Sequence, residues 1–410
     1  MVSASVDNTT SDENARISSS KRAGIIAAVV GLVVVAFFLF IGRGIAEDAG
    51  RPLTTLSPKG GPAEEIHSLV KPVFIVAGLV FVLVQSALLF TLFRYRRHKD
   101  DADGVDEPIQ RHGNNPLEWA WTIGPALLLA FLAIPNVQTI WALENDAKNA
   151  DMEVEVRGQQ WWWEFRYDTN NDGKPEVITA QQLVIPVGET VRVKIRSNDV
   201  IHSFWIPALN GKKDAVPGRT HRLAIQAEKP GIYEGQCTEF CGLSHGYMRM
   251  QVKALSEADY ATWMANQTSA PEEPVNGTEA ALGKEIYFQK CASCHQINGY
   301  DSAGGATGED LPDPDYRGRD HPLTAGNAPN LSHMMSRQRF AGNMFDLYEP
   351  DGQPQLAIPT GTPNESKLGE WLRNPQLMKP MAADLNRGMP NLKLSEEEIR
   401  VLVAYLTQLK

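Results

Sequence analysis

Cysteine is scarce in this sequence: a chain of 410 residues has four, in two close pairs, Cys237 with Cys241 and Cys291 with Cys294. A secreted scaffold held by disulfides would use more cysteines, spread more widely. Basic residues are not in excess either. The formal net charge of −10 argues against a nucleic-acid partner, because such proteins normally carry a basic face. A histidine stands beside each pair, so the two pairs predict two cofactor sites.

Three long runs contain little or no charge: Ala23 to Gly42, about Pro72 to Phe93, and about Leu117 to Trp141. Each reaches or exceeds the roughly 20 residues that cross a bilayer as a helix, which disfavours a buried core helix. The basic stretch Arg94 to Lys99 follows the second run, so the positive-inside rule places that loop in the cytoplasm. The third run then returns the chain outward, and everything after Leu143 is expected to be extracytoplasmic.

The first run, Ala23 to Gly42, is either a cleaved signal peptide or a retained additional helix. It is longer than a usual signal core, and no clean small-x-small cleavage site follows it. We therefore favour retention.

Hydrophobic residues change to a period of two between Met152 and about Leu255. Val154 and Val156, and later Val191, Val193 and Ile195, alternate with charged neighbours, as in half-buried strands. Turn signals recur at short intervals, at Asn171-Asp-Gly-Lys, Pro186-Val-Gly, Asn210-Gly, Pro217-Gly and Pro230-Gly. This pattern predicts a β-sandwich of about 100 residues.

The stretch from Cys237 to Met248 gathers two thiols, the imidazole of His245 and a thioether within a short segment. Soft sulfur ligands together with imidazole favour copper over hard cations. A second imidazole, His202, follows the predicted strand Val191–Arg196. We expect His202 and the Cys237–Met248 segment to lie in loops that converge at one end of the sandwich.

Three consecutive tryptophans stand in the segment Gln159 to Phe165. On a strand, Trp161 and Trp163 share one face and Trp162 takes the other. One face is expected to be core, and at least one tryptophan is expected at a surface or interface, where its flat ring can meet a partner.

A linker rich in Ser, Pro and Glu, Asn266 to Asn276, follows a helical segment, Ser256–Met264, and marks a domain boundary. Beyond it stands Cys291-Ala-Ser-Cys294-His295, the pattern of covalent c-type haem attachment. The alternatives are a thioredoxin-like redox pair or a plain disulfide, but no βαβ pattern surrounds this motif. His295 would take one axial position on the iron.

The second axial ligand is expected to be a methionine or histidine later in the chain. Met389 lies just before a helix that opens with a capping box, Ser395 with Glu398. We assign Met389 to this role, while methionine is more often core filler. Its competitors are Met334, Met335, Met344, Met378 and Met381.

Glu118 is an ionisable residue at the cytoplasmic start of the third run. An acid there complements the helix dipole, worth under about 1 kcal/mol. Its place at the membrane boundary also allows a role in proton handling.

With these motifs, the chain resembles subunit II of a haem–copper cytochrome oxidase with a fused C-terminal cytochrome c domain. Three motifs carry the resemblance: Cys-x-Glu-x-Cys-x-x-x-His-x-x-Met with an upstream His-Ser-Phe, Gln-Trp-x-Trp, and Cys-x-x-Cys-His with a late Met-Pro. It covers about residues 64 to 410. The chain departs from the plainest form of the family in the first hydrophobic run, in Trp162, and in an acidic insertion around Asp301 to His321.

The resemblance implies that Cys237 and Cys241 bridge two coppers of a binuclear CuA centre. The other ligands that it implies are the side chains of His202, His245 and Met248 and the backbone carbonyl of Glu239. The Glu239 carboxylate would also help to bind a Mg or Mn ion at the interface with subunit I.

The family also implies roles for two further residues. Trp161 matches the tryptophan through which electrons enter CuA from cytochrome c. Glu118 matches an acid near the mouth of a proton channel of subunit I.

The architecture that follows is a multi-domain membrane protein: an α-helical transmembrane hairpin with an extra N-terminal helix, a cupredoxin-like β-sandwich and an all-α cytochrome c domain. The expected boundaries are 1–63 for the N-terminal tail, 64–145 for the hairpin, 146–265 for the CuA domain, 266–278 for the linker and 279–410 for the cytochrome c domain.

The implied function is electron transfer in a terminal oxidase of the bacterial plasma membrane, from cytochrome c through CuA to haem in subunit I, where oxygen is reduced to water. The implied partners are subunits I and III, cytochrome c or a quinol–cytochrome c reductase as donor, and the bilayer. The chain alone is expected to reduce no oxygen, because it lacks the helices to hold the catalytic centre. The alternatives are a CuA-containing component of a nitric or nitrous oxide reductase, or a copper-delivery protein, which would need no covalent haem.

Overall fold

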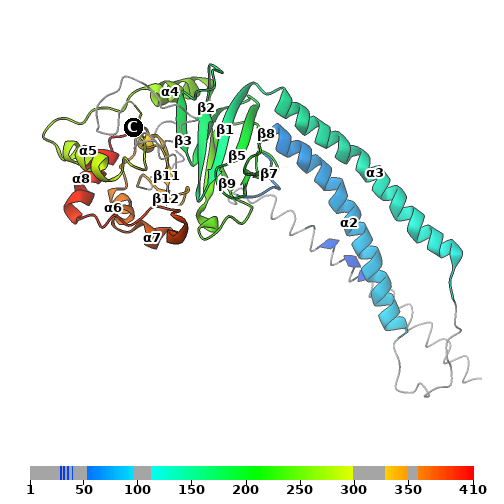
Figure 1. Cartoon of the computed structure of the whole chain (residues 1–410). Coiled ribbons are helices and arrows are strands. Elements are labelled where there is room, and N and C mark those ends of the chain that lie inside the picture. Colours follow the sequence, from blue (N-terminus) through cyan, green and yellow to red (C-terminus); the bar gives the residue numbers. More distant parts are fainter. Residues whose placement is uncertain are drawn as a thin grey trace, which may run out of the picture. The chain divides into compact units, whose positions relative to one another are not determined.

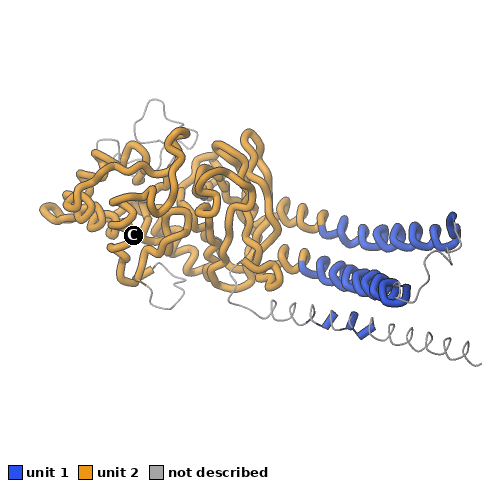
Figure 2. Tube along the Cα trace, turned by 90° about the horizontal axis from the view of Figure 1, so that it is seen from below, with its two compact units in different colours: residues 1–50, 67–139 blue, residues 51–66, 140–410 orange. Residues whose placement is uncertain are grey.

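The computed structural model describes residues 53–95, 112–298, 328–349 and 359–410, with a few positions between 28 and 39. The chain divides into two compact units (Figure 2). The first comprises Met1–Gly50 and His67–Thr139, and the second comprises Arg51–Ile66 and Ile140–Lys410.

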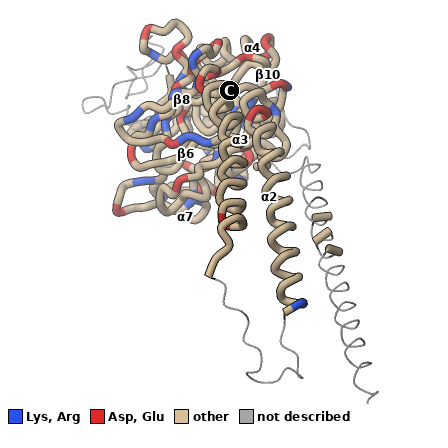
Figure 3. The backbone as a smooth tube through the Cα atoms, turned by 90° about the vertical axis from the view of Figure 1, so that its right-hand side faces the viewer, with Lys and Arg blue, Asp and Glu red and all other residues tan. Residues whose placement is uncertain are grey.

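Two long helices dominate the first unit, α2 (Gly61–Arg94) and α3 (Asn115–Lys148), and both continue into the second. Each is long and apolar enough to cross a membrane. Figure 3 shows how few charged residues they carry along most of their length. Large apolar side chains such as Phe74, Leu83 and Phe131 are exposed, as expected for lipid-facing residues. The second and third apolar runs are therefore confirmed as helices, whereas most of Ala23–Gly42 lies outside the described residues.

Two β-sheets form the first part of the second unit (Figure 1). The five-stranded sheet has the order β3-β2-β1-β5-β8, and its strands are β1 (Met152–Gln159), β2 (Trp162–Tyr167), β3 (Val177–Ala180), β5 (Val191–Ser197) and β8 (His221–Ile225). The three-stranded sheet has the order β4-β10-β9, with β4 (Gln182–Pro186), β10 (Arg249–Leu255) and β9 (Gly231–Gln236). A separate ribbon pairs β6 (His202–Trp205) with β7 (Lys212–Ala215).

The predicted alternation is confirmed in β1 and β5. Val154 lies opposite Val193, and Val156 opposite Ile195, in a parallel pair. All four side chains are fully buried, while their charged neighbours are partly exposed. Burial of alternate apolar residues against the second sheet builds the sandwich core.

The C-terminal domain is built mainly of helices, namely α5 (Glu279–Lys290), α6 (Glu365–Arg373), α7 (Pro375–Met378) and α8 (Glu396–Leu406). A short antiparallel pair, β11 (Arg339–Phe340) with β12 (Phe345–Asp346), is also present. Helices α5 and α8 pack so closely that a Cβ at Gly283 would lie 1.9 Å from the carbonyl oxygen of Val401. The capping box of Ser395 and Glu398 is confirmed at the start of α8.

Two sequence-based expectations need correction. The helix α4 (Glu257–Thr268) runs beyond the predicted end at Met264 and into the predicted linker. Its last turn buries Gln267, whose Nε2 donates to Ser336 Oγ at 3.0 Å, so a contact with the C-terminal domain favours the longer helix. His202 does not lie in a loop but begins strand β6, where pairing with Ala215 fixes its backbone. The insertion Asp301–His321 lies outside the described residues.

Candidate functional site

The segment between β9 and β10 folds back on itself and is tied to β6. The N–H of Cys237 donates to the carbonyl of Met248 at 2.9 Å and closes the segment, which contains a 3-10 turn (His245–Tyr247). The N–H of Thr238 donates to the carbonyl of Ser203 at 3.1 Å. This bond brings β6, and with it His202, to the two cysteines.

The predicted copper-binding residues come together around the Cys241 thiol. Its Sγ lies 3.8 Å from Cys237 Sγ, 3.5 Å from His245 Nδ1 and 3.8 Å from Met248 Sδ. The Glu239 carbonyl oxygen lies 3.3 Å from Cys237 Sγ. The ligand atoms of His202, Cys237 and Cys241 lie within 4.8 Å of one another. Separations of this size place all six predicted groups around one site.

His202 is fully buried and oriented by a carboxylate. Its Nε2 lies 2.8 Å from Asp199 Oδ1, while its Nδ1 is buried and has no hydrogen-bond partner among the described residues. A carboxylate that holds one imidazole nitrogen leaves the other to a metal, and such partners orient metal-binding histidines. The orphaned Nδ1 and the soft donors around it fit copper.

The charge state of the cysteines also suits a metal. The Cys241 thiol lowers the pKa of Cys237, although burial opposes this shift. Burial pushes the pKa of His202 down, but the hydrogen bond to Asp199 and the nearby Cys237 thiol outweigh it and raise the pKa. A thiolate at Cys237 provides the nucleophilic sulfur that binds metals.

Trp161 lies directly behind this site. Its indole Nε1 donates to the Cys241 carbonyl at 3.0 Å, and Gln160 Nε2 donates to the same oxygen at 2.8 Å. Trp161 and Trp163 both belong to the sandwich core, as the predicted shared face required. Trp161 is only 2% exposed. Trp161 also lines the cavity described next, and its role in electron entry stays a prediction.

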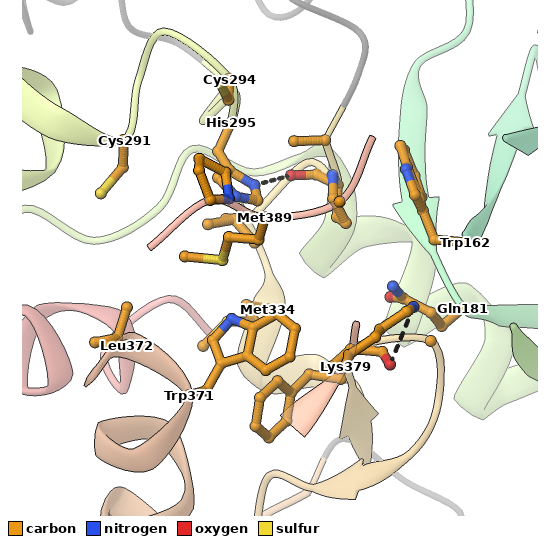
Figure 4. Close-up of a pocket in the computed structure, with 18 of the residues that line it drawn as sticks. Trp162, Gln181, Cys291, Cys294, His295, Met334, Trp371, Leu372, Lys379 and Met389 are labelled. Atoms are coloured by element: carbon orange, nitrogen blue, oxygen red, sulfur yellow. Dashed lines mark hydrogen bonds between the residues drawn. The ribbon is translucent and has the colours of Figure 1, made fainter. Parts of the chain in front are cut away.

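A second site is a cavity of about 370 Å³, lined mainly by the C-terminal domain, where all the predicted haem-binding residues meet (Figure 4). Cys291, Cys294, His295 and Met389 line it. His295 Nδ1 lies 2.8 Å from the Pro329 carbonyl oxygen, which leaves Nε2 as the available ligand atom. Met334 and Met381 also line the cavity, whereas the other predicted competitors, Met335, Met344 and Met378, are not among its lining residues.

The chemistry of the residues that line the cavity fits a haem. Both cysteines are free thiols, as thioether attachment requires. Arg337 lines the cavity in a buried position; its Nη2 donates to the Asn330 carbonyl, while its Nε has no partner among the described residues. A buried guanidinium N–H without a partner is costly and needs an acceptor, and a carboxylate of a haem would supply one.

Four residues that line the cavity were not predicted from the sequence: Gln181, Arg337, Trp371 and Lys379. Lys379 Nζ donates to the carbonyls of Trp161 at 2.5 Å and Ala341 at 3.3 Å, and burial lowers its pKa to about 7. A lysine between methionine and proline normally indicates a surface position, so no signal distinguished it.

Glu118 caps the start of α3. Its Oε1 accepts from the N–H of Asn114 at 3.0 Å, and Asn114 Oδ1 accepts from the N–H of Leu117 at 3.3 Å. This reciprocal arrangement agrees with the helix-terminus interpretation of Glu118. The proton-handling role stays a prediction.

Three segments match known protein families. Residues 57–139 match the transmembrane domain of cytochrome c oxidase subunit II, residues 171–255 match its periplasmic domain, and residues 280–410 match cytochrome c. The two predicted cofactor sites fall in the second and third segments.

Curated relatives resemble the chain along most of its length. Cytochrome c oxidase subunit 2 of Alkalihalophilus pseudofirmus is 32% identical over 367 residues, covering 87% of this chain and 91% of that protein. The protein of the same name from Bacillus sp. strain PS3 is 31% identical over 378 residues, covering 88% and 93%. The crystal structure of the periplasmic domain of cytochrome oxidase subunit II of Bradyrhizobium japonicum is 30% identical, covering 29% of this chain and 94% of that chain, with a TM-score of 0.27. The chain thus belongs to the cytochrome c oxidase subunit II family and carries a cytochrome c domain at its C-terminal end.

Proposed function

We propose that the chain is the electron-transfer subunit of a membrane-bound haem–copper terminal oxidase. It would pass electrons from cytochrome c, its own domain or an external donor, through binuclear CuA to haem in subunit I, where oxygen is reduced to water. The observation that carries this proposal is the convergence of six predicted copper-binding groups, together with a cavity lined by Cys-x-x-Cys-His, within one compact unit.

In this proposal His202, Cys237, Cys241, His245, Met248 and the Glu239 carbonyl hold the copper. Copper bridged by two thiolates supplies a one-electron centre that reorganises little. The protein contributes a rigid and dry setting: Asp199 orients His202, and Gln160 and Trp161 hold the carbonyl of Cys241. Burial of all three metal-facing residues His202, Cys237 and Cys241 excludes water.

Cys291 and Cys294 would attach a c-type haem covalently, with His295 and Met389 as axial ligands. A haem supplies the second one-electron centre. Tyr287 donates its O–H to the His295 carbonyl at 2.8 Å, so the attachment motif is held from both the ring and the backbone of His295.

The remaining proposals concern the partners of the chain and its location in the cell. Glu239 would share a Mg or Mn ion with subunit I, and Glu118 would serve the mouth of its proton channel. Subunit III, and cytochrome c or a quinol–cytochrome c reductase, complete the expected partners. The helices α2 and α3 would anchor the chain in the bacterial plasma membrane, with both cofactor domains outside.

The test is spectroscopy of the purified full chain. EPR should show the seven-line signal of mixed-valence binuclear copper, and the haem should remain attached after denaturation. A four-line single-copper signal would contradict the binuclear site, and loss of all haem on denaturation would favour a copper-delivery protein. Oxygen consumption by the isolated chain would contradict a purely electron-transferring role.

A further inference from the structure

The wall of the haem cavity is built from two domains. Four lining residues come from the copper-binding sandwich, Gln160, Trp161, Trp162 and Gln181, and the others come from the C-terminal domain. In Figure 4, Trp162 and Gln181 close the cavity on one side, while Cys291 and Leu372 lie on the opposite side. A cofactor in this cavity would therefore touch both domains.

Trp162 differs from its two neighbours in the tryptophan triplet. Trp161 and Trp163 belong to the hydrophobic core of the sandwich, whereas Trp162, on the other face of β2, does not. Trp162 is nevertheless only 5% exposed, because the C-terminal domain covers it. Its indole Nε1 is buried and has no hydrogen-bond partner among the described residues. A buried N–H without an acceptor is costly, so the site is built for a ligand that accepts.

Two residues from different domains line the same cavity and each carries an unpaired donor. Arg337 Nε, from the C-terminal domain, is buried and unpaired like Trp162 Nε1. Indole and guanidinium N–H groups donate hydrogen bonds, and neither side chain can accept one. Together they call for an acceptor-rich, anionic group. A haem carries two propionate carboxylates, which are such groups.

Hydrogen bonds between the two domains fix the position of Trp162. Lys379 Nζ donates to the carbonyl of the preceding residue, Trp161. The N–H of Arg249 donates to the Gly342 carbonyl at 3.0 Å, and Ser244 Oγ donates to the Pro380 carbonyl at 2.6 Å. These bonds hold the two domains together around the indole, so its N–H is preorganised.

From this geometry we infer that Trp162 completes the haem site by donating its indole N–H to a propionate carboxylate of the haem. The inference rests on the proposed function, which places a c-type haem in the cavity. It makes the haem a shared group of the two domains, and it assigns to the second tryptophan of the triplet a role as a positioning residue between the redox centres.

The test compares Trp162→Phe with the wild-type chain, both purified at full length with their cofactors. Phenylalanine keeps an aromatic ring but removes the N–H. Without this donor the propionate becomes more negative, which favours ferric haem. The equilibrium constant for haem reduction should fall about threefold, or roughly 30 mV for a one-electron couple. The matched control is Trp263→Phe, which alters a buried tryptophan of the sandwich core that does not line the cavity.

A measurement on the wild-type chain guards against a variant that fails to fold. The propionate bands in the resonance Raman spectrum should shift in D₂O, and this shift should be reduced in Trp162→Phe. An unchanged potential and an unchanged propionate band in Trp162→Phe, with haem and copper signals intact, would overturn this inference alone. Absence of covalent haem or of the seven-line copper signal in the wild type would instead overturn the proposed function.

Discussion

Lys379 of the C-terminal domain donates a hydrogen bond of 2.5 Å from its buried amine to the backbone carbonyl of Trp161 in the copper-binding domain. The indole of Trp161 in turn donates to the carbonyl of Cys241, a predicted copper ligand. The lysine therefore connects the haem domain to the copper site through one residue, and the stability of the domain contact should depend on it.

Replacement of Lys379 by methionine should weaken domain docking. It keeps most of the side-chain volume but leaves the Trp161 and Ala341 carbonyls without their donor, at a cost of about 1.5–3 kcal/mol, or roughly tenfold or more in the docked population. Flash-induced electron transfer from haem to copper should slow accordingly. Lys367→Met is the control, because Lys367 pairs with the exposed Glu370 on its own helix. Equal transfer rates in the two variants would contradict the docking role.

Gly342 should not tolerate alanine. Its φ is +79°, and a Cβ there would lie 2.0 Å from the Tyr247 carbonyl oxygen of the copper-binding segment. Gly173, with a φ of +89° and open space around it, provides a control for the backbone strain alone. We expect Gly173→Ala to cost about 1 kcal/mol and Gly342→Ala at least 1–3 kcal/mol more. Thermal unfolding measures the difference in stability between the two variants. A copper EPR signal that changes in Gly342→Ala and not in Gly173→Ala would place the clash at the copper-binding segment.

Asp199 should control copper affinity through His202. Replacement by asparagine removes the carboxylate that holds His202 Nε2, and changes at such supporting positions typically cost 10–100-fold in affinity. Competition with a copper chelator measures this loss. Asp172→Asn, in an exposed turn of the same domain, is the matched control and should retain wild-type affinity. Identical affinities in both variants would rule out the orienting role.

Lys253 on β10 should make stability depend on pH. Burial lowers its pKa to about 8, while the Asp259 charge opposes the shift. The unfolded chain, with a pKa near 10.4, binds more protons between about pH 8 and 10.4, so stability should rise with pH across this window. The gain is up to about 3 kcal/mol, at 1.36 kcal/mol for each unit of pKa. Lys253→Met should abolish this rise in thermal unfolding curves; a rise that persists would assign it to another group.

The local pattern of the chain predicted a large part of the architecture. Alternation at Val154, Val156 and Val193 identified buried strands, and Ser395 with Glu398 identified the start of α8, because period and capping depend on neighbours in sequence. The copper-binding segment was predictable for the same reason, since its thiols, imidazole and thioether lie within one short stretch. Glu118 was also placed at a helix start.

Other features depend on contacts between distant segments. At least one tryptophan of the triplet was predicted to reach a surface or interface; Trp162 does so, and its covering partner is the C-terminal domain of the same chain. His202 was expected in a loop and lies in a strand, because pairing with β7 decides its backbone. Lys379 carried no signal in the sequence.

The sequence by itself determined which chemistry the chain carries: soft metal-binding groups at fixed spacing, a haem-attachment motif and apolar helices. Only the tertiary structure decided how these parts are coupled. The Lys379 bond to Trp161 joins residues 218 positions apart, and the haem cavity joins two domains. Such contacts depend on which surfaces dock once each domain has buried its own core, and no periodicity or spacing along the chain encodes that choice.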